Sequence, residues 1–279
     1  MRTDSINLVS FTPEHLDGAL ALSRQAKWPH RAEDWHLALR LSQGVAATDE
    51  TGRVVGTILM TPYRQDCATI NMVIVDETLR GRGLGRKLMD AAMALAGDRS
   101  LRLIATTDGL PLYRKLGFVA EGEIFQHQGH LADLAPAGDI ETATADDFSA
   151  IKALDHAAFG ADRCTLIDAL TDVAQVVVIR RHGRIQAFGA LRAFGRGDVI
   201  GPVIASNTED AKSLITALAL RKPSGFLRVD TNESSGLTGW LAEIGLNHVG
   251  GGIAMRRPPG AGALSQDARI FALANQALG

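Results

Sequence analysis

The chain has 279 residues, enough for one large domain or two of average size. Its 46% apolar and 22% charged residues are usual for a soluble globular protein. The 29 lysines and arginines nearly balance the 31 aspartates and glutamates, which argues against a nucleic-acid surface. No apolar run approaches the roughly 20 residues of a membrane span. We therefore expect neither a nucleic-acid nor a membrane partner.

The cysteines and the N-terminal residues favour a cytoplasmic protein. Cys67 and Cys164 have neither metal-ligand spacing nor a disulfide framework, so we expect reduced thiols. The N-terminal sequence MRTDSINLVSF has no long apolar stretch of the kind that marks a secretory signal. No metal is expected, because three histidines of the second half stand isolated from one another: His156, His182 and His248.

Strands and helices alternate along the first half of the chain. Thr12-Pro13-Glu14 predicts a helix start, with Thr12 as N-cap and Pro13 at the first helical position. The apolar run IxMVIV predicts a strand that is buried on both faces. The predicted strands are Ile6–Phe11, Val45–Thr48, Val54–Tyr63, Cys67–Val75, Leu101–Ala105 and Phe118–Gln126. The predicted helices are Thr12–Gln25, Ala32–Leu41, Gly85–Ala96 and Leu110–Leu116.

The same order of elements returns after Gly129–Asp139, a segment without periodicity. The predicted strands of the second half are Ile140–Thr144, Gln175–Arg180, Ile185–Phe194, Asp198–Ala205 and Phe226–Asp230. One helix is expected to begin at Ala145, and two more cover Glu209–Leu220 and Leu237–Ile244. The final segment, ARIFALANQALG, is apolar at helical spacing and is expected to dock on the body.

The repeated order indicates two copies of one domain type. The segments LYRKLGFVAEGE and LAEIGLNHVGGG hold corresponding places in the two halves. We predict a first domain at residues 1–131, a linker at 132–138 and a second domain at 139–279. One large α/β domain is the alternative.

A loop of alternating glycines and cations, RGRGLGRK at Arg80–Lys87, precedes a helix. A helix N-terminus offers unpaired N–H groups and partial positive charge, and glycine lets an anion approach the backbone. Arginine and lysine add charge-assisted hydrogen bonds. The loop therefore predicts a phosphate or pyrophosphate cradle, and a basic turn that only caps the helix is the alternative. It is neither a Walker loop nor a G-x-G-x-x-G motif, since Arg86 replaces the last glycine.

Two motifs at a suitable separation resemble the GNAT superfamily of acyl-CoA N-acyltransferases. Arg80-x-x-Gly83-x-Gly85, after the strand INMVIVDETL, resembles the acetyl-CoA loop of that family. PLYRKLGFVAEGE resembles its final helix and strand, with a tyrosine four residues before Gly-Phe. The resemblance covers about residues 3–130, and WPHRAEDWHLAL is similar to bacterial members with a divergent second domain. It implies tandem GNAT-like α/β domains, each with a mixed sheet.

The resemblance implies roles for the residues of these motifs. The peptide groups of Val73, Ile74 and Val75 are expected to pair with the pantetheine arm of CoA, and one N–H group to polarise the thioester carbonyl. Thr106 replaces an asparagine that contacts the cofactor arm in many relatives, which bears on cofactor affinity. The residues expected to bind the pyrophosphate are Arg80, Gly81, Arg82, Gly83, Leu84, Gly85 and Arg86.

The resemblance also implies that Tyr113 is the general acid that protonates the departing thiolate. A thiol and a phenol have pKa values of about 8.5 and 10, so this transfer is reasonable; a tyrosine of the core is the alternative. The acceptor amine must lose a proton before it attacks. Glu123 and His127 are candidate bases, and Asn71 is a candidate holder of water.

The acceptor itself is expected between the first two helices, where this fold places it. Trp28, His30, Trp35 and His36 lie in that part of the sequence. Core packing is the favoured interpretation for Trp35, because its spacing to Ala38 and Leu39 is helical.

The second half lacks both motifs. Glu209 and Asp210 stand where cations are needed, and their charge would repel a pyrophosphate; Leu241 stands at the tyrosine position. We expect a degenerate copy that does not bind CoA and covers part of the acceptor cleft or strand edges of the first domain.

The sequence thus predicts an N-acetyltransferase that transfers the acetyl group of acetyl-CoA, without a metal, to a primary amine. The acceptor is a small molecule or a protein, and the enzyme is expected to be a monomer or a homodimer. A non-catalytic acetyl-CoA sensor or interaction module is the alternative.

Overall fold

The computed structural model describes residues 6–132, 134–135, 138, 140–258 and 268–279. The predicted linker at 132–138 lies partly outside these residues. The first half comprises β1 (Asn7–Ser10), α1 (Leu16–Gln25), α2 (Ala32–Leu41), β2 (Gln43–Thr48), β3 (Val54–Tyr63), β4 (Cys67–Val75), α3 (Leu84–Ala96), β5 (Ser100–Ala105), α4 (Leu110–Lys115) and β6 (Val119–Gly129). Short 3-10 turns at Pro13–His15 and Glu77–Leu79 precede α1 and α3.

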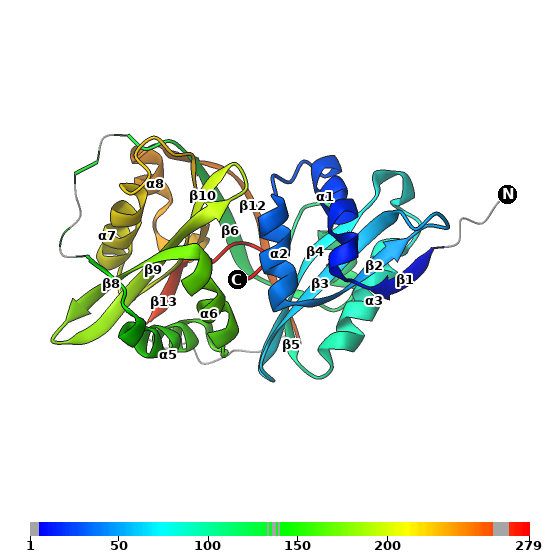
Figure 1. Ribbon diagram of the computed structural model, residues 1–279, viewed down its shortest axis with the longest axis horizontal. Coiled ribbons are helices and arrows are strands. Elements are labelled where there is room, and N and C mark those ends of the chain that lie inside the picture. The colour runs from blue at the N-terminus through cyan, green and yellow to red at the C-terminus, as the bar shows by residue number, and fades with distance from the viewer. Residues whose placement is uncertain (1–5, 133, 136–137, 139, 259–267) are drawn as a thin grey trace.

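The second half repeats this order (Figure 1). It comprises β7 (Glu141–Thr142), α5 (Phe148–Phe159), α6 (Cys164–Val173), β8 (Ala174–Arg181), β9 (Arg184–Phe194), β10 (Gly197–Ala205), α7 (Thr208–Ala219), β11 (Leu227–Asn232), α8 (Thr238–Glu243), β12 (Leu246–Arg257) and β13 (Arg269–Ala272). No helix in the described part of the chain is long and apolar enough to cross a membrane.

The sequence missed helix α6 and strand β12 and assigned the wrong structure to the final segment. Helix α6 was not predicted, although the backbone N–H of its first residue, Cys164, donates to the carboxylate of Asp162 at 2.8 Å and so supplies a start signal. The final segment contains the strand β13, and the predicted helical spacing is wrong. Phe271 and Ala272 are both buried because β13 is inserted between other strands, so its apolar residues follow one another without a period. The prediction that this segment docks on the body is confirmed.

Each half is a sheet with helices on both faces. In the first half, Trp35 of α2 and Leu22 of α1 pack with Leu59 on one face of β3. Ile58, the preceding residue of β3, packs on the opposite face with Leu88 of α3. The second half repeats this arrangement, with α5 and α6 in one core cluster and α7 and α8 in another. Strand β4 is buried on both faces, as its apolar run predicted.

The two halves exchange one strand each, β6 and β12. The continuous sheet has the order β1-β2-β3-β4-β5-β12-β6-β11-β10-β9-β8-β7, with β13 attached to β10. Strand β12 of the second half therefore pairs with β5 and β6 of the first. Strand β6 of the first half pairs with two strands of the second half, β11 and β12. The predicted domain limits remain a prediction, but the sheet does not divide at the linker (Figure 1).

A bulge in the pairing of β3 with β4 turns the end of β4 away from β5. The two strands pair in parallel only as far as Thr69 and Arg102. Beyond that point the register between β3 and β4 shifts, and Met72 takes a left-handed φ of 50°. The hydroxyl of Thr57 donates to the carbonyl oxygen of Met72 at 2.8 Å and holds the bulge. The end of β4 is thereby turned away from β5, which creates the gap that the candidate site uses.

Candidate active site

The predicted anion cradle is an exposed turn at the start of α3. Gly81 and Gly83 have φ values of 76° and 82°, which favour glycine. A Cβ at either position would meet no atom within 4 Å, so the space beside the backbone is open. The first turn of α3 has no acidic residue and no side-chain cap, and its N–H groups therefore remain available to an anion.

The cations of this turn have few competing partners. Arg80, Arg82 and Lys87 are exposed, and no ion pair to them is found among the described residues. Arg86 pairs with Asp90 one helical turn further on, at 3.0 Å. An anion at the N-terminus of α3 would thus meet both backbone dipoles and free positive charge.

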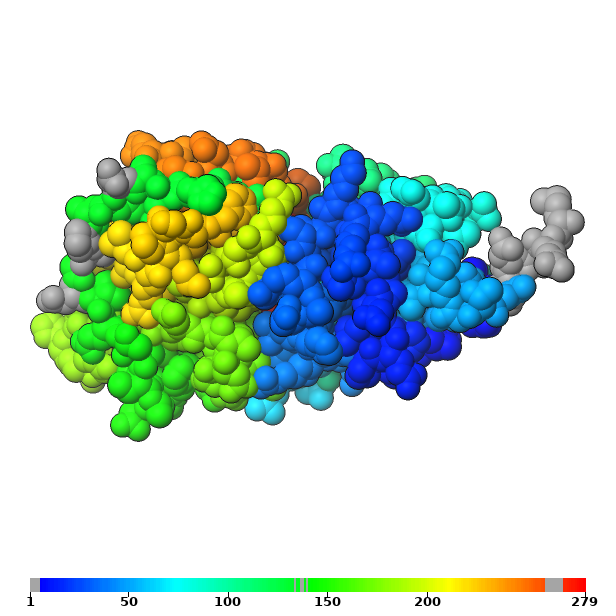
Figure 2. All heavy atoms as spheres, turned by 45° about the horizontal axis from the view of Figure 1, so that its top comes forward, coloured from blue at the N-terminus to red at the C-terminus, as the bar shows by residue number. Residues whose placement is uncertain are grey.

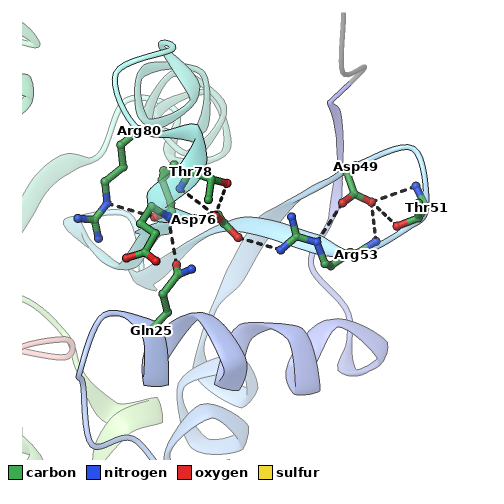
Figure 3. A network of polar contacts seen from close by, with 9 residues as sticks. Gln25, Asp49, Thr51, Arg53, Asp76, Thr78 and Arg80 are labelled. Carbon is green, nitrogen blue, oxygen red and sulfur yellow. Dashed lines mark hydrogen bonds and ion pairs between the residues drawn. The ribbon is translucent and has the colours of Figure 1, made fainter. Parts of the chain in front are cut away.

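A polar network fixes the chain between β4 and the cradle (Figure 3). The buried carboxylate of Asp76 accepts bonds from the backbone and the hydroxyl of Thr78, and from Arg53 at 2.8 Å. Burial opposes its charge, but these hydrogen bonds outweigh burial and lower the pKa of Asp76 to about 2. Gln25 of α1 accepts a bond from the backbone of Glu77. The network ties the entrance of the cradle to α1 and to the β2–β3 turn.

The gap between β4 and β5 opens into a cavity of about 280 Å³. Both halves of the chain contribute to its wall. The first half provides Trp28, His30, Asn71, Val73, Thr106, Tyr113, Gln126 and Gln128. The second half provides Phe194, Arg196, Arg228, Asn275, Gln276 and Ala277. The cavity therefore brings together the predicted acid, the end of β4 and residues that the sequence did not connect with them.

Tyr113 lies in the wall of this cavity on α4. Its side chain is 7% exposed and its ring contacts Phe118, with centroids 6.1 Å apart. Burial raises the pKa of Tyr113 to about 12. A Cβ on Gly109 would lie 2.7 Å from the Tyr113 ring, so glycine is required there. The phenol is thus held in one place and stays protonated near neutral pH.

Asn71 presents an unpaired acceptor in the cavity wall. Its Nδ2 donates to the hydroxyl of Thr61 at 2.9 Å, and Thr61 bonds in turn to Ser42 at 2.6 Å. Its Oδ1 is buried and has no hydrogen-bond partner in the described part of the chain. A buried acceptor of this kind stabilises a ligand or water that can donate to it.

The other predicted site residues lie in different places. Thr106 lines the cavity, although its hydroxyl accepts a bond from the backbone of Gly109. Glu123 borders a neighbouring cavity of about 590 Å³ and does not line the cavity of Tyr113. His127 is fully buried, and neither ring nitrogen has a partner among the residues described. Burial and the neighbouring His248 lower its pKa.

The four aromatic residues predicted near the acceptor lie in different environments. Trp28 and His30 line the cavity, whereas Trp35 is a core residue, as predicted, and donates to Ser23 at 3.0 Å. His36 is exposed on α2 and does not line the cavity. Ser23 also bonds to Nδ1 of His30 at 3.2 Å, so the core supports the His30 ring directly.

We expect His30 to make the protein less stable in acid. Burial lowers its pKa to about 4, with the cations Arg228 and Arg192 adding to the effect and Asp34 opposing it. Because the unfolded chain binds this proton near pH 6.5, stability should fall as the pH drops from 6.5 towards 4, by up to about 3 kcal/mol. Urea unfolding across this range should show a shallower pH slope for His30→Gln.

His182→Asn is the matched control for this measurement. His182 is exposed in the β8–β9 turn with φ 51°, a conformation that asparagine tolerates. An unchanged slope in His30→Gln, or an equal change in both variants, would show that His30 titrates normally.

The second half has the same gap but fills it with its own chain. Strands β10 and β11 pair only at Asp198 and Val199, then separate. Strand β13 occupies the space, pairing with β10 at Val203–Ala205 and accepting a bond from Asn232 of β11. At the N-terminus of α7, Asn207 accepts from the backbone of Asp210 and caps the helix. The open gap between strands and the uncapped helix N-terminus of the first-half site are therefore both replaced by contacts within the second half.

The second half also reaches into the first-half site. The β9–β10 turn lies against α2: Arg31 donates to the carbonyl of Ala193 at 2.9 Å, and the Gly195 N–H donates to Asp34 at 2.9 Å. In Figure 2 the yellow-green β9–β10 segment meets the blue α1–α2 segment along the seam between the halves. Gln276, just beyond β13, donates to Gln126 and to Asp230.

Family comparisons agree with the fold. The model of the acetyltransferase (GNAT) family matches residues 9–118, and that of an acetyltransferase (GNAT) domain matches residues 151–271. The chain is 30% identical over 285 residues to YitH of Bacillus subtilis, an uncharacterized N-acetyltransferase, and the match covers 98% of each chain. The chain thus belongs to the GNAT family of N-acetyltransferases and is an acyltransferase with two GNAT domains.

Solved structures show the same fold at low sequence identity. A proposed acetyltransferase from Pyrococcus horikoshii has a TM-score of 0.83 at 17% identity, covering 100% of this chain and 98% of its own. A tandem GNAT protein from the clavulanic acid biosynthesis pathway has a TM-score of 0.64 at 12% identity, covering 92% and 100%. The tandem architecture predicted from the sequence is therefore confirmed.

Proposed function

We propose that this acyltransferase transfers the acetyl group of acetyl-CoA to a primary amine, with Tyr113 as general acid. The observation that carries the proposal is the shared cavity: Tyr113 and the end of β4 that does not pair with β5 line one space, and the anion cradle follows β4 directly. GNAT enzymes generally use acetyl-CoA. The pyrophosphate would lie on the N-terminus of α3, and the pantetheine arm would pair with Val73–Val75 as an added strand.

In the proposed reaction the amine nitrogen attacks the acetyl carbon directly. A backbone N–H of β4 stabilises the charge on the carbonyl oxygen. The C–S bond then breaks, and the Tyr113 hydroxyl gives its proton to the sulfur. The amine proton passes to water, and Tyr113 regains a proton from solvent.

A water held by Asn71 is the best-supported route for the amine proton. Asn71 lines the cavity with a buried, unpaired oxygen, whereas Glu123 and His127 do not line it. The role of Glu123 as a base, predicted from the sequence, would require access from the neighbouring cavity.

A thiol-release assay with acetyl-CoA and a panel of amines tests the proposed reaction. Amine-dependent release of CoA, together with the acetylated amine in mass spectrometry, is the expected result. Binding of acetyl-CoA without release of thiol for any amine would instead support the non-catalytic sensor.

We expect Gly83→Leu to weaken CoA binding at least about 100-fold, because a side chain there would fill the space of the phosphate and remove charge-assisted hydrogen bonds. Calorimetric titration with CoA provides the measurement, and the parent chain should bind one CoA. Two equivalent sites would contradict the proposal that β13 and the acidic start of α7 prevent binding in the second half.

Gly52→Leu separates backbone strain from loss of the anion site. Gly52 has a φ of 84°, close to the 82° of Gly83, and a Cβ there would also meet no atom within 4 Å. Equal losses of CoA affinity in the two variants would indicate general destabilisation.

A further inference from the structure

The cavity of Tyr113 is lined by cations and by no carboxylate. Lys27 reaches it from the α1–α2 connection, Arg196 from the β9–β10 turn and Arg228 from β11. No aspartate or glutamate occurs among the described residues of its wall. Because the three cations come from three separate segments and both halves, they are brought together only by the folded tandem chain.

The positive charge of this wall is only partly neutralised. Arg228 donates from Nε to Asp230 at 2.9 Å, but Asp230 also accepts from Gln276. Lys27 and Arg196 are exposed and have no ion pair within the part of the chain that the structure describes. Two of the three cations thus remain without a carboxylate partner.

A fourth cation, Arg192, lies buried behind the wall. Its guanidinium stands 4.9 Å from the centre of the Phe194 ring, and that of Arg228 stands 5.2 Å from the same ring. Arg192 donates only to the carbonyl groups of Ala193 and Ala274 in the described chain, and its Nε has no partner. Burial lowers its pKa to about 10, opposed by Asp34, with Arg31 and Arg228 adding to the decrease. The Arg192 guanidinium is therefore charged in a buried place without a carboxylate hydrogen-bond partner, and the neighbouring cations Arg31 and Arg228 add to the cost of its charge.

We propose that the acceptor amine carries an anionic group, a carboxylate or a phosphate, which Arg196, Arg228 and Lys27 bind while the amine faces Tyr113. This inference rests on the proposed acetyltransferase function and names its substrate class. A planar guanidinium binds either anion through paired hydrogen bonds. Trp28 and Phe194 supply an apolar wall for the body of the substrate, and the cavity volume suits a small molecule. Diamines and polyamines would place a second positive charge among these cations and are excluded.

Matched amines test this class with the intact enzyme and acetyl-CoA. The probes are β-alanine, β-alaninamide and 1,3-diaminopropane, each with homologues longer by up to three methylene groups, and 2-aminoethyl phosphate as the second anion. We expect kcat/KM to be about 10- to 100-fold higher for the anionic members than for the amides, and lowest for the diamines. A comparison of the carboxylate substrates with 2-aminoethyl phosphate shows which anion is preferred.

Arg196→Gln should lower kcat/KM much more for the anionic members than for the amides, and so remove most of the preference. Lys27→Asn should act in the same direction, since asparagine tolerates the left-handed φ of 59° at that position. Arg184→Gln, an exposed change at the first residue of β9, is the control and should leave the ranking intact.

Three outcomes distinguish a failure of the inferred substrate class from a failure of the proposed acetyltransferase function. Diamines or amides used as well as the anionic amines would overturn the inference and leave the acetyltransferase proposal in place. A raised KM for acetyl-CoA in Arg196→Gln, with the ranking of amines unchanged, would also overturn it by assigning the cation to the cofactor. Failure of every amine to release thiol would overturn the proposed function, and the inference with it.

Discussion

Tyr113→Phe should lower turnover about 100- to 10,000-fold, the usual contribution of a general acid, while acetyl-CoA binding stays nearly unchanged. The ring would keep its contact with Phe118 and its place against Gly109, so only the proton donor is lost. Steady-state kinetics and calorimetric titration of the same preparation separate the two effects. Unchanged turnover would assign the proton transfer to water or to another residue.

The chain supplies its own control for this prediction, because it contains only two tyrosines. Tyr63 is fully buried and donates its hydroxyl to the carbonyl of Leu278 at 2.6 Å. Tyr63→Phe should cost about 1 kcal/mol of stability through the lost hydrogen bond and leave turnover close to the parent value.

The pH profile gives a further test of the acid. With the pKa of Tyr113 raised to about 12, the phenol stays protonated while the acceptor ammonium, of pKa about 10, loses its proton. We therefore expect kcat/KM to rise with pH and to show no decrease below about pH 11. A decrease near pH 8 or 9 would identify an acid other than Tyr113.

A chain that ends at Ala135 should fail to fold as a soluble monomer. Strand β6 would lose both of its neighbours, β11 and β12, and β5 would lose β12 along Leu101–Ala105. Unpaired strand edges and the uncovered apolar surface favour aggregation. Size-exclusion chromatography and thermal unfolding should show aggregates or the absence of a cooperative transition.

Co-expression with residues 136–279 is the matching control. The second fragment carries the missing strands, so the two pieces should assemble into a soluble complex that releases thiol like the intact chain. If the first fragment alone were monomeric, unfolded cooperatively and acetylated the same amine, the second half would be an independent module.

Local patterns predicted most of the elements because their signals lie within a few residues. The apolar run of β4, the glycines before α3 and the proline at the start of the first helix each act on their own neighbours. Helix α6 was missed although Asp162 accepts a bond from its first N–H, and β12 was missed because its three consecutive glycines are unusual in a strand. Strand β13 has no alternation because it is covered on both sides. The exchange of β6 and β12 depends on pairing between residues far apart in the chain. The local pattern of apolar residues does not indicate which strand will be the partner.

The sequence likewise predicted the part of the candidate site that lies in local motifs and missed the part formed by residues far apart in the chain. Tyr113 and the cradle at Arg80–Arg86 belong to compact motifs, and their roles remain predictions that the geometry supports. Arg196 and Arg228 were missed because their importance comes from a cavity shared by the two halves. The signals present were weak: a charged residue within the strand LRVD, and glutamines two residues apart at Gln126 and Gln128, which alternation places on one face.

The shared strands also constrain how the protein is made on the ribosome. The first half cannot complete its sheet when β6 emerges, because β12 is synthesised about 130 residues later, or roughly 6 to 26 s at ordinary rates of translation. During that interval β5 and β6 present unpaired edges that a nascent-chain chaperone would need to cover. Synonymous codons that slow translation between β6 and β12 should therefore reduce the soluble yield without changing a single residue of the finished enzyme.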